Sequence, residues 1–588
     1  MNYLGINVGH GASASLMING EIVIAAQEER FTKIKNFSGY PKKSIDFCLK
    51  YLKEKKLRVD IAAFATIKHS VFYYKYPFNH FFKIKDYQDH YENFFNKKSK
   101  IKNENYLKKL SGKEDLYLPY NKLSKKNLNS NSYFQKMLKN FLNKQSQNTI
   151  DKIIFIDHHT CHAHYAFYSQ SEKKKNSAII TLDSEGDGLN QTVWKYSHKS
   201  KEIIKIRASA TCDLARIYKF ITLILKMKPD EHEFKVMGLA PYAKKEYSQM
   251  VYDDVFKNLL KVKDMKVVKN KRPKDLYSYL LKKTKPYRFD NIAAATQMLV
   301  ENITIKLFRQ INKKINATNF YLSGGVSMNI KMNKELLGLK FVRNLFVAPT
   351  GSDESLSIGA CYYLCDKKIS KSLRNVYLGQ EISNINLEDK IKKNFDSKSY
   401  KIFNNIQHSK IAKILKNYEP IAIARDREEF GARALGNRSI IASPSSSSVV
   451  KKINESIKNR DFWMPFALTI LKTKHKKYIK NPKNINSAFM TIGFDTISKK
   501  YNRIIAGTHI YDRTVRPQIL EQNQNPNYFS LIKEFEKITG VPALLNTSLN
   551  LHGNPMSSTL EDVIYTFKNS GLMYLYINDK FLIQKSKK

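Results

Sequence analysis

The chain has 588 residues, 42% of them hydrophobic, and its 101 lysine and arginine residues outnumber 52 aspartate and glutamate residues to give a formal net charge of +49. This length exceeds what one hydrophobic core supports, so we expect two large domains with insertions. No apolar run reaches the ~18–20 residues of a membrane-spanning helix, and no signal-peptide pattern opens the chain. Five cysteines without metal-type spacing indicate reduced thiols. We expect a cytoplasmic protein.

The positive charge would ordinarily suggest a nucleic acid or an anionic membrane as partner. Most of the excess is lysine, however, and it is spread along the chain among many asparagine and isoleucine residues. A bias toward A/T-rich codons gives the same composition without any partner. The densest basic runs, residues 97–126 and 261–285, contain no recognisable motif. A nucleic-acid partner is therefore not expected.

The first part of the chain predicts a β-hairpin and a helix. Residues 2–8, 13–18 and 21–26 have strand character, and Asn19-Gly20 is a typical two-residue hairpin turn. Residues 40–54 have helical periodicity. Residues 69–148 are rich in Lys, Asn, Tyr and Phe without clean periodicity, and we interpret them as a mainly helical insertion.

Four later apolar strands each end in a polar or glycine-rich loop. They are predicted at residues 152–156, 178–182, 319–322 and 344–348, with helices at 290–311 and 354–365. Open α/β sheets bind ligands at this edge. Two similar α/β halves would fit the actin/Hsp70-like (ASKHA) fold.

The polar stretch after residue 370 predicts a domain junction. We expect a first domain at residues 1–370, a junction at 371–410 and a second α/β domain at 411–588. The second domain is predicted to contain strands at 420–424, 489–494 and 541–545.

A histidine cluster follows the strand at 152–156. His158 and His162 are four residues apart, so on a helix both imidazoles project from one face and can share a metal ion. Asp183 and Asp353, each at a strand end, are the candidate oxygen ligands. Two nitrogen and two oxygen ligands suit iron or zinc. His159 with His164 is a competing pair.

Two segments of the second domain suit phosphate binding. The segment FGARALGNRSII at 430–441 contains Arg433 and Arg438, and GVPALLNTSLN at 540–550 ends a strand in Asn546-Thr547-Ser548. Guanidinium groups can hold phosphate oxygens through two hydrogen bonds at once.

These motifs resemble the nodulation-type and antibiotic O-carbamoyltransferases. The resemblance rests on the histidine segment at 158–168, on DSEG at 183–186, EFKVMGLAPY at 233–242, SGGV at 323–326 and PTGSD at 349–353, and on the two segments of the second domain. It implies metal ligation by His158, His162, Asp183 and Asp353, with Fe²⁺ preferred over Zn²⁺. It also implies that Gly324 and Gly325 lie under a nucleotide. The second domain would be of the carbamoyl-adenylate-forming, threonylcarbamoyl-AMP synthase-like type.

The chain departs from the family pattern in a few places. Gly11 of the GHGAS loop at 9–13 replaces a usual aspartate, and Met464 of the block KNRDFWMPFA replaces a common arginine, for which Arg460 or Arg513 could substitute. His10 of the same loop is expected to line the transfer site as general base. Lys35 is expected beside it, although a solvated lysine explains this residue equally well.

The resemblance implies an enzyme with two half-reactions. Carbamoyl phosphate and ATP, with Mg²⁺, would give carbamoyl adenylate, and the carbamoyl group would then move to a hydroxyl of a sugar, glycan or other natural product. The groups expected to bind phosphate and carbamate are Arg433, Arg438, Lys458, Arg516, Asn546 and Ser548. A homodimer is expected. The alternatives are a tRNA threonylcarbamoyl-adenosine-type enzyme and a sugar kinase-like phosphotransferase, although Asn7 stands where such kinases carry aspartate.

Overall fold

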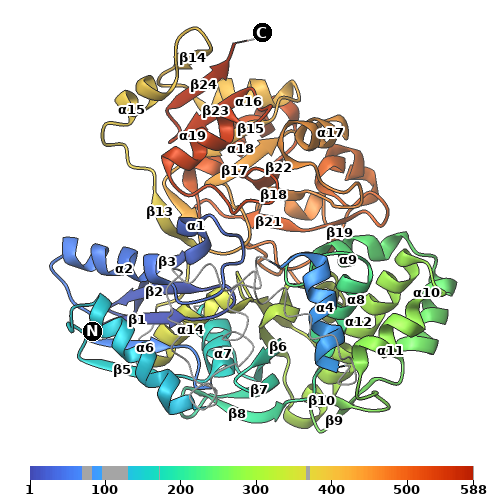
Figure 1. Cartoon of the computed structure of the whole chain (residues 1–588). Coiled ribbons are helices and arrows are strands. Elements are labelled where there is room, and N and C mark those ends of the chain that lie inside the picture. Colours follow the sequence, from blue (N-terminus) through green and yellow to red (C-terminus); the bar gives the residue numbers. More distant parts are fainter. Residues whose placement is uncertain (69–81, 96–129, 171, 366–370, 587–588) are drawn as a thin grey trace. The chain divides into compact units, whose positions relative to one another are not determined.

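The computed structural model describes residues 1–68, 82–95, 130–170, 172–365 and 371–586 (Figure 1). It separates into two compact units, Met1–Leu373 and Arg374–Lys588. Among the described helices, none is long and apolar enough to cross a membrane.

The first half of unit 1 is a five-stranded sheet in the order β3-β2-β1-β4-β5. Strands β1 to β3 are antiparallel neighbours, whereas β4 and β5 run parallel to β1. The turn between β2 and β3 has positive φ at Asn19 (49°) and Gly20 (80°), so the predicted hairpin is confirmed. The strands are β1 (Asn2–Asn7), β2 (Ser13–Ile18), β3 (Glu21–Gln27), β4 (Ile61–Phe64) and β5 (Lys152–Phe155).

The second half of unit 1 repeats this topology. Its sheet has the order β12-β11-β6-β7-β8, with β6 to β8 antiparallel and β11 and β12 parallel to β6. The strands are β6 (Ser177–Gly186), β7 (Leu189–Ser197), β8 (Glu202–Ser209), β11 (Asn319–Ser323) and β12 (Asn344–Val347). Because the two halves have the same strand order, unit 1 has an actin/Hsp70-like α/β fold, as the sequence predicted.

Helices α7 (His158–Tyr168) and α14 (Leu356–Leu364) join the two halves. Helix α7 packs on β6 and β11 of the second sheet, α14 packs on β1 and β2 of the first sheet, and the two helices pack on each other. At their contact a Cβ added to Gly359 would lie 2.0 Å from the Cys161 carbonyl oxygen. Only glycine permits this approach.

The remaining elements of unit 1 are the helices and the short strand pair that connect the strands of the two sheets. The predicted helices at 40–54 and 290–311 are α2 and α12. In the predicted insertion, the described residues form α4 and α6, and the rest lies outside the described part of the chain. These elements are α1 (Glu28–Thr32), α2 (Lys42–Glu54), α4 (Ile84–Phe95), α6 (Asn131–Gln145), α8 (Leu214–Ile224), α9 (Glu233–Leu239), α10 (Lys245–Val251), β9 (Leu260–Lys263), β10 (Lys266–Lys269), α11 (Leu276–Thr284), α12 (Phe289–Ile315) and α13 (Ile330–Gly338).

Unit 2 is built on a mixed sheet in the order β14-β24-β23-β15-β17-β22-β18-β21. Helix α19 packs on β15, and α18 packs on β18, β22 and α16. The strands are β14 (Tyr400–Phe403), β15 (Ile421–Ala424), β17 (Arg438–Ala442), β18 (Ala467–Leu471), β21 (Pro517–Leu520), β22 (Ala543–Ser548), β23 (Tyr574–Ile577) and β24 (Phe581–Lys585), and the helices are α15 (Leu387–Asn394), α16 (His408–Lys416), α17 (Ser448–Ile453), α18 (Pro526–Thr539) and α19 (Leu560–Lys568). Two short strand pairs, β13 (Tyr377–Glu381) with β16 (Arg427–Glu429) and β19 (Phe494–Asp495) with β20 (Thr514–Val515), complete it.

Unit 2 differs from the sequence expectations in three ways. The strand predicted at 489–494 is wrong except at its end, because Met490 has a φ of 58° and interrupts the extended run. Strand β22 continues to Ser548, so Asn546 and Thr547 lie on a paired strand and not in a loop. Residues expected in a junction instead form α15 and β14, because β14 pairs with β24 and one face of α15 enters the core.

Candidate functional site

Helix α7 places two histidines on one face. Asp157, which follows β5, caps the helix because its carboxylate accepts a hydrogen bond from the backbone N–H of Thr160 at 2.9 Å. All residues of α7 are buried. His158 and His162 therefore have their imidazoles inside unit 1, one helical turn apart.

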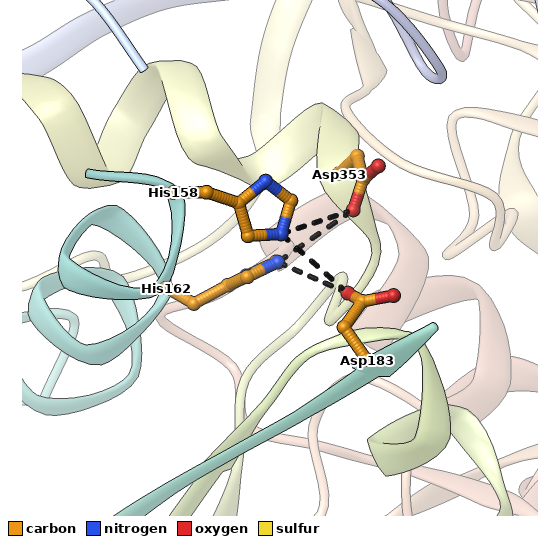
Figure 2. Close-up of side chains that lie close together, drawn as sticks. All are labelled: His158, His162, Asp183 and Asp353. Carbon is orange, nitrogen blue, oxygen red and sulfur yellow. Dashed lines mark ion pairs between the residues drawn. The ribbon is translucent and has the colours of Figure 1, made fainter. Parts of the chain in front are cut away.

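Figure 2 shows that His158 and His162 of α7, Asp183 of β6 and Asp353 before α14 point toward one another. One ligand atom from each lies within 4.8 Å of every other. The His162 Nε2 atom lies 3.3 Å from Asp183 Oδ2 and 3.6 Å from Asp353 Oδ1, and the His158 Nε2 atom lies 3.8 Å from each of these oxygens. Neither Nε2 atom makes a hydrogen bond within the described structure.

Neighbouring groups orient this cluster. The Nδ1 atom of His162 lies 3.0 Å from Ser323 Oγ, which leaves Nε2 to face the carboxylates. Asp183 accepts hydrogen bonds from the backbone N–H groups of Ser184 at 2.6 Å and Gly325 at 3.1 Å. Gly325, predicted to lie under a nucleotide, thus directly holds one of the predicted metal ligands. Gly324 precedes it with a φ of 93°.

The charges of the cluster favour a bound cation. Burial alone would lower the pKa of His158, but Asp183 and Asp353 outweigh it and raise this pKa to about 9. Burial opposes ionisation of Asp183 as well, yet the two imidazoles hold its pKa well below the usual range. Two carboxylates and two unbonded imidazole nitrogens, all buried, form a donor set that fits a divalent ion.

The competing pair of histidines does not converge. The Nδ1 atom of His159 lies 2.7 Å from Thr181 Oγ1, and that of His164 lies 2.8 Å from the Thr160 carbonyl oxygen. Burial, with His158 and His162 close by, lowers the pKa of His159 to about 3. Among the described residues, the converging cluster of ligand atoms therefore includes neither His159 nor His164.

Unit 2 contains a cluster of basic side chains. Burial and the charge of Arg433 lower the pKa of Arg460 to about 10, and burial with both other arginines lowers the pKa of Arg516. The charged groups that lower the pKa values of Arg460 and Arg516 are thus other arginines. Lys458 Nζ donates to Asn550 Oδ1 at 2.7 Å and to Ser548 Oγ at 3.2 Å. Lys458 is buried and the three arginines are half-buried, and such a gathering of cations is suited to an anion.

Comparisons with known proteins identify the family of the chain. The carbamoyltransferase N-terminus family model matches residues 2–362, and the carbamoyltransferase C-terminus model matches residues 412–585. The chain belongs to the carbamoyltransferase family. It is accordingly an enzyme that transfers carbamoyl groups, and the kinase-like alternative is set aside.

The carbamoyltransferase has relatives along its whole length. It is 30% identical to uncharacterized protein MJ1051 of Methanocaldococcus jannaschii over 99% of this chain and 100% of that protein. It is 25% identical to nodulation protein NolNO of Sinorhizobium fredii over 98% of this chain and 79% of that protein. Among solved structures, the chain is similar to component A of the Acidaminococcus fermentans (R)-2-hydroxyglutaryl-CoA dehydratase. The two proteins are 13% identical over 63% of this chain and 100% of that protein, with a TM-score of 0.32. That similarity is too distant to bear on function.

The GHGAS loop of the carbamoyltransferase lies beside the segment that carries Lys35. Gly9 and Gly39 exchange backbone hydrogen bonds at 3.0 Å, and Ala12 donates to the Phe37 carbonyl at 3.2 Å. His10 is half-buried. Burial lowers its pKa, but the carboxylates of Asp230, Asp353 and Glu354 outweigh burial and raise it. The loop has no room for a side chain at residue 11, because a Cβ there would lie 2.9 Å from Glu354 N.

Arg438 does not join the basic cluster, which corrects the prediction that it binds the nucleotide. Its guanidinium is fully buried and donates to the backbone carbonyls of Gln380, Arg425, Asp426, Asn437 and Ser558. These five acceptors use the donors that a phosphate would need. Asn546 has a similar role, since its amide donates to the Ala434 carbonyl and to Thr469 Oγ1.

The proposed substitutes for the arginine missing at Met464 behave differently. Arg513 is exposed and stacks on Tyr501, whereas Arg460 lies within the basic cluster and donates to Thr547 Oγ1 at 3.0 Å. The sequence interpretation missed Asn550, which holds Lys458. Its signal was the second asparagine of NTSLN, two residues after the strand end.

Proposed function

We propose that this carbamoyltransferase activates carbamoyl phosphate with ATP to form carbamoyl adenylate, and that it then transfers the carbamoyl group to a hydroxyl of a sugar or other natural product. In the first half-reaction, water cleaves carbamoyl phosphate to carbamate and phosphate. A carbamate oxygen then attacks the α-phosphorus of ATP, and pyrophosphate leaves. In the second, the acceptor oxygen attacks the carbamoyl carbon, AMP leaves and the acceptor proton passes to a base.

The basic cluster of unit 2 supports the first half-reaction, and it is the observation that carries the proposal. Carbamoyl phosphate and Mg²⁺-ATP are both anionic, and they repel each other on approach. Arg433, Arg460 and Arg516 would offset this charge, while Lys458 is already held by Asn550 at 2.7 Å. Because these side chains are buried or half-buried, their charges act in a medium less polar than bulk water.

The His158, His162, Asp183 and Asp353 cluster supports the second half-reaction. These residues would hold a divalent ion, with Fe²⁺ the first choice and Zn²⁺ the second. When bound, such an ion would act as a Lewis acid toward the carbamoyl carbonyl. The Gly325 N–H, 3.1 Å from Asp183 Oδ2, fixes one ligand carboxylate, and Ser323 fixes one imidazole. Gly324 and Gly325 would place the nucleotide beside this cluster.

His10 remains our candidate for the base that takes the acceptor proton. Its raised pKa means that more of the imidazole is protonated near neutral pH than in an ordinary histidine. The base would therefore work best at mildly alkaline pH. Lys35 would contact the carbamoyl adenylate or its departing AMP.

The test separates the two half-reactions. Carbamoyl adenylate is detected by mass spectrometry, with release of phosphate and pyrophosphate, from ATP, Mg²⁺ and carbamoyl phosphate. We expect Arg433→Ala and Lys458→Ala to lower adenylate formation at least 100-fold, while His158→Ala and His162→Ala retain it and lose transfer to a hydroxyl acceptor. Equal loss of both half-reactions in all four variants would contradict the division.

The remaining alternative is a tRNA-modifying enzyme. Its support is the net charge of +49. A folded protein that forms no adenylate from carbamoyl phosphate but binds tRNA with steep salt dependence would favour it.

A further inference from the structure

The β-hairpin that carries Asp183 ends in an aspartate that sequence analysis did not single out. Gly186 of β6 pairs with Leu189 of β7, so Asp187 and Gly188 form a two-residue turn with φ values of 52° and 85°. Positive φ at both positions is typical of a type I′ turn, for which Asp-Gly is favoured. The pairing register shifts between Leu182 and Gly186, which is the part of the strand that contains Asp183.

The Asp187 carboxylate connects this turn to two other segments through hydrogen bonds. It accepts hydrogen bonds from Thr66 Oγ1 at 2.7 Å, from the Ile67 N–H at 3.1 Å and from the Lys68 N–H at 2.9 Å. These three residues follow strand β4. Its Oδ2 atom also accepts the His158 N–H at 2.8 Å. One carboxylate thus joins the hairpin, the loop after β4 and the first residue of α7.

The bond to His158 satisfies a donor that has no partner within its own helix. The first N–H groups of a helix lack intrahelical acceptors, and a negative charge is favourable beside them. Asp187 therefore fixes the backbone of His158 in relation to β6. Asp183, the ligand opposite His158, lies on that strand.

The neighbouring residue, Gly186, leaves room for the His158 imidazole. A Cβ added to Gly186 would lie 2.1 Å from His158 Cδ2, so the ring occupies the space that a side chain would fill. His162 is oriented differently, through Nδ1 and Ser323 Oγ at 3.0 Å. Among the described residues, His158 has no comparable hydrogen bond on its ring. Its position is set by its backbone and by packing.

We propose that Asp187 is a positioning residue of the carbamoyl-transfer site. It holds His158 by accepting a hydrogen bond from the His158 backbone N–H, while Gly186 leaves room for the His158 imidazole. The inference rests on the metal site of the proposed function. It predicts that the turn at Asp187 determines how tightly, and in what geometry, the four ligands bind a divalent ion.

Cobalt binding by the whole protein tests this role without any assay of activity. Co²⁺ is titrated into metal-free protein, and its visible absorption bands report affinity and coordination geometry. Asp187→Asn has the same shape, but its NH₂ group cannot accept the hydrogen bonds that arrive on one side of the carboxylate. We expect roughly tenfold to 100-fold weaker Co²⁺ binding, as is usual when a group that orients a metal ligand is lost. We also expect altered band intensities.

Two variants are matched controls. Asp157 lies at the same helix end, but its carboxylate accepts the Thr160 N–H at 2.9 Å, so Asp157→Ala weakens the helix cap and leaves the bond to His158 intact. Asp264 occupies a two-residue turn of the same kind between β9 and β10, with φ values of 48° and 58° at Asp264 and Met265. Asp264→Asn should bind Co²⁺ as the wild type does. Gly186→Ala should reproduce the weak binding, since it displaces the ring while Asp187 remains.

The outcomes are distinct. Wild-type affinity and spectrum in Asp187→Asn would overturn the positioning role and leave the metal site standing. Equal weakening by Asp157→Ala would also overturn it, because the effect would then be general loss of helix stability. A wild-type protein that binds no Co²⁺ would overturn the metal site and this role together, whereas the carbamoyl adenylate assay would still judge the first half-reaction.

Discussion

The two arginines of the segment FGARALGNRSII have different environments although they are five residues apart. Arg438 opens strand β17, is fully buried and donates to five backbone carbonyls. Arg433 precedes the strand and lies close enough to Arg460 and Arg516 to lower their pKa values. The Arg438 guanidinium therefore links backbone segments of unit 2, and the Arg433 guanidinium contributes charge to the basic cluster.

Conservative replacement should separate these roles. A lysine at 438 has one nitrogen and cannot serve acceptors on several sides, so buried carbonyls would lose their partners. We expect Arg438→Lys to lower the free energy of unfolding by about 3 kcal/mol. Arg433→Lys should change it little but slow adenylate formation at least tenfold, because a bidentate contact is lost. Urea denaturation and the adenylate assay measure the two effects. Wild-type stability in Arg438→Lys with loss of nucleotide binding would restore the original prediction.

At the scale of elements, the metal-type cluster depends on the packing of α7 against α14. His158 and His162 lie on α7, and Asp353 lies just before α14. A Cβ on Gly359 would approach the Cys161 carbonyl oxygen of α7 to 2.0 Å. Any increase in the distance between the helices would separate the histidines from Asp353.

Gly359→Ala should therefore weaken both the fold and the site. We expect a loss of about 2–3 kcal/mol in unfolding free energy, which is typical of overpacking, and weaker Co²⁺ binding. Gly338→Ala is the control, since a Cβ at the end of α13 meets nothing within 4 Å. It should leave Co²⁺ binding unchanged and alter stability by at most about 1 kcal/mol. Calorimetry and cobalt titration would show the difference; similar behaviour of the two variants would contradict it.

The sequence predicted those features that local patterns determine. The turn at Asn19-Gly20 and the spacing of His158 and His162 follow from strand and helix geometry alone. Asp183 and Asp353 were found because parallel strands end at one edge of a sheet. The contacts of Arg438 were not predictable, since its acceptors at 380 and 558 are far away in the sequence. Strand β22 likewise extends to Ser548 only through its pairing with β17.

For the whole molecule, the net charge of +49 does not set the polarity of either site. The cluster in unit 1 contains Asp183 and Asp353 and is suited to a cation, whereas the cluster in unit 2 contains arginines and is suited to anions. Each polarity fits one half-reaction of the proposed function. The charge that matters for the chemistry is local, because salt screens buried and half-buried groups much less than exposed ones.

One half-buried acid should make the stability of the protein depend on pH. Glu301 of α12 accepts a hydrogen bond from Gln297 Nε2 at 2.7 Å, and burial nevertheless raises its pKa from 4.5 to about 7. Between these values the folded protein retains a proton that the unfolded chain releases. This group therefore lowers stability as pH rises from about 4.5 to 7, and the full penalty remains above pH 7.

Glu301→Gln removes this titration and keeps an oxygen that can accept from Gln297. We expect the variant to gain about 2–3 kcal/mol of unfolding free energy over the wild type at pH 8, and to lose the advantage near pH 4.5, where Glu301 is protonated in both states. Glu246→Gln on α10 removes an exposed charge that does not contribute to the pKa shift of Glu301, and it is the control. Urea denaturation at both pH values checks the prediction. A difference between Glu301→Gln and the wild type that does not change with pH would show that burial of this carboxyl does not govern the effect.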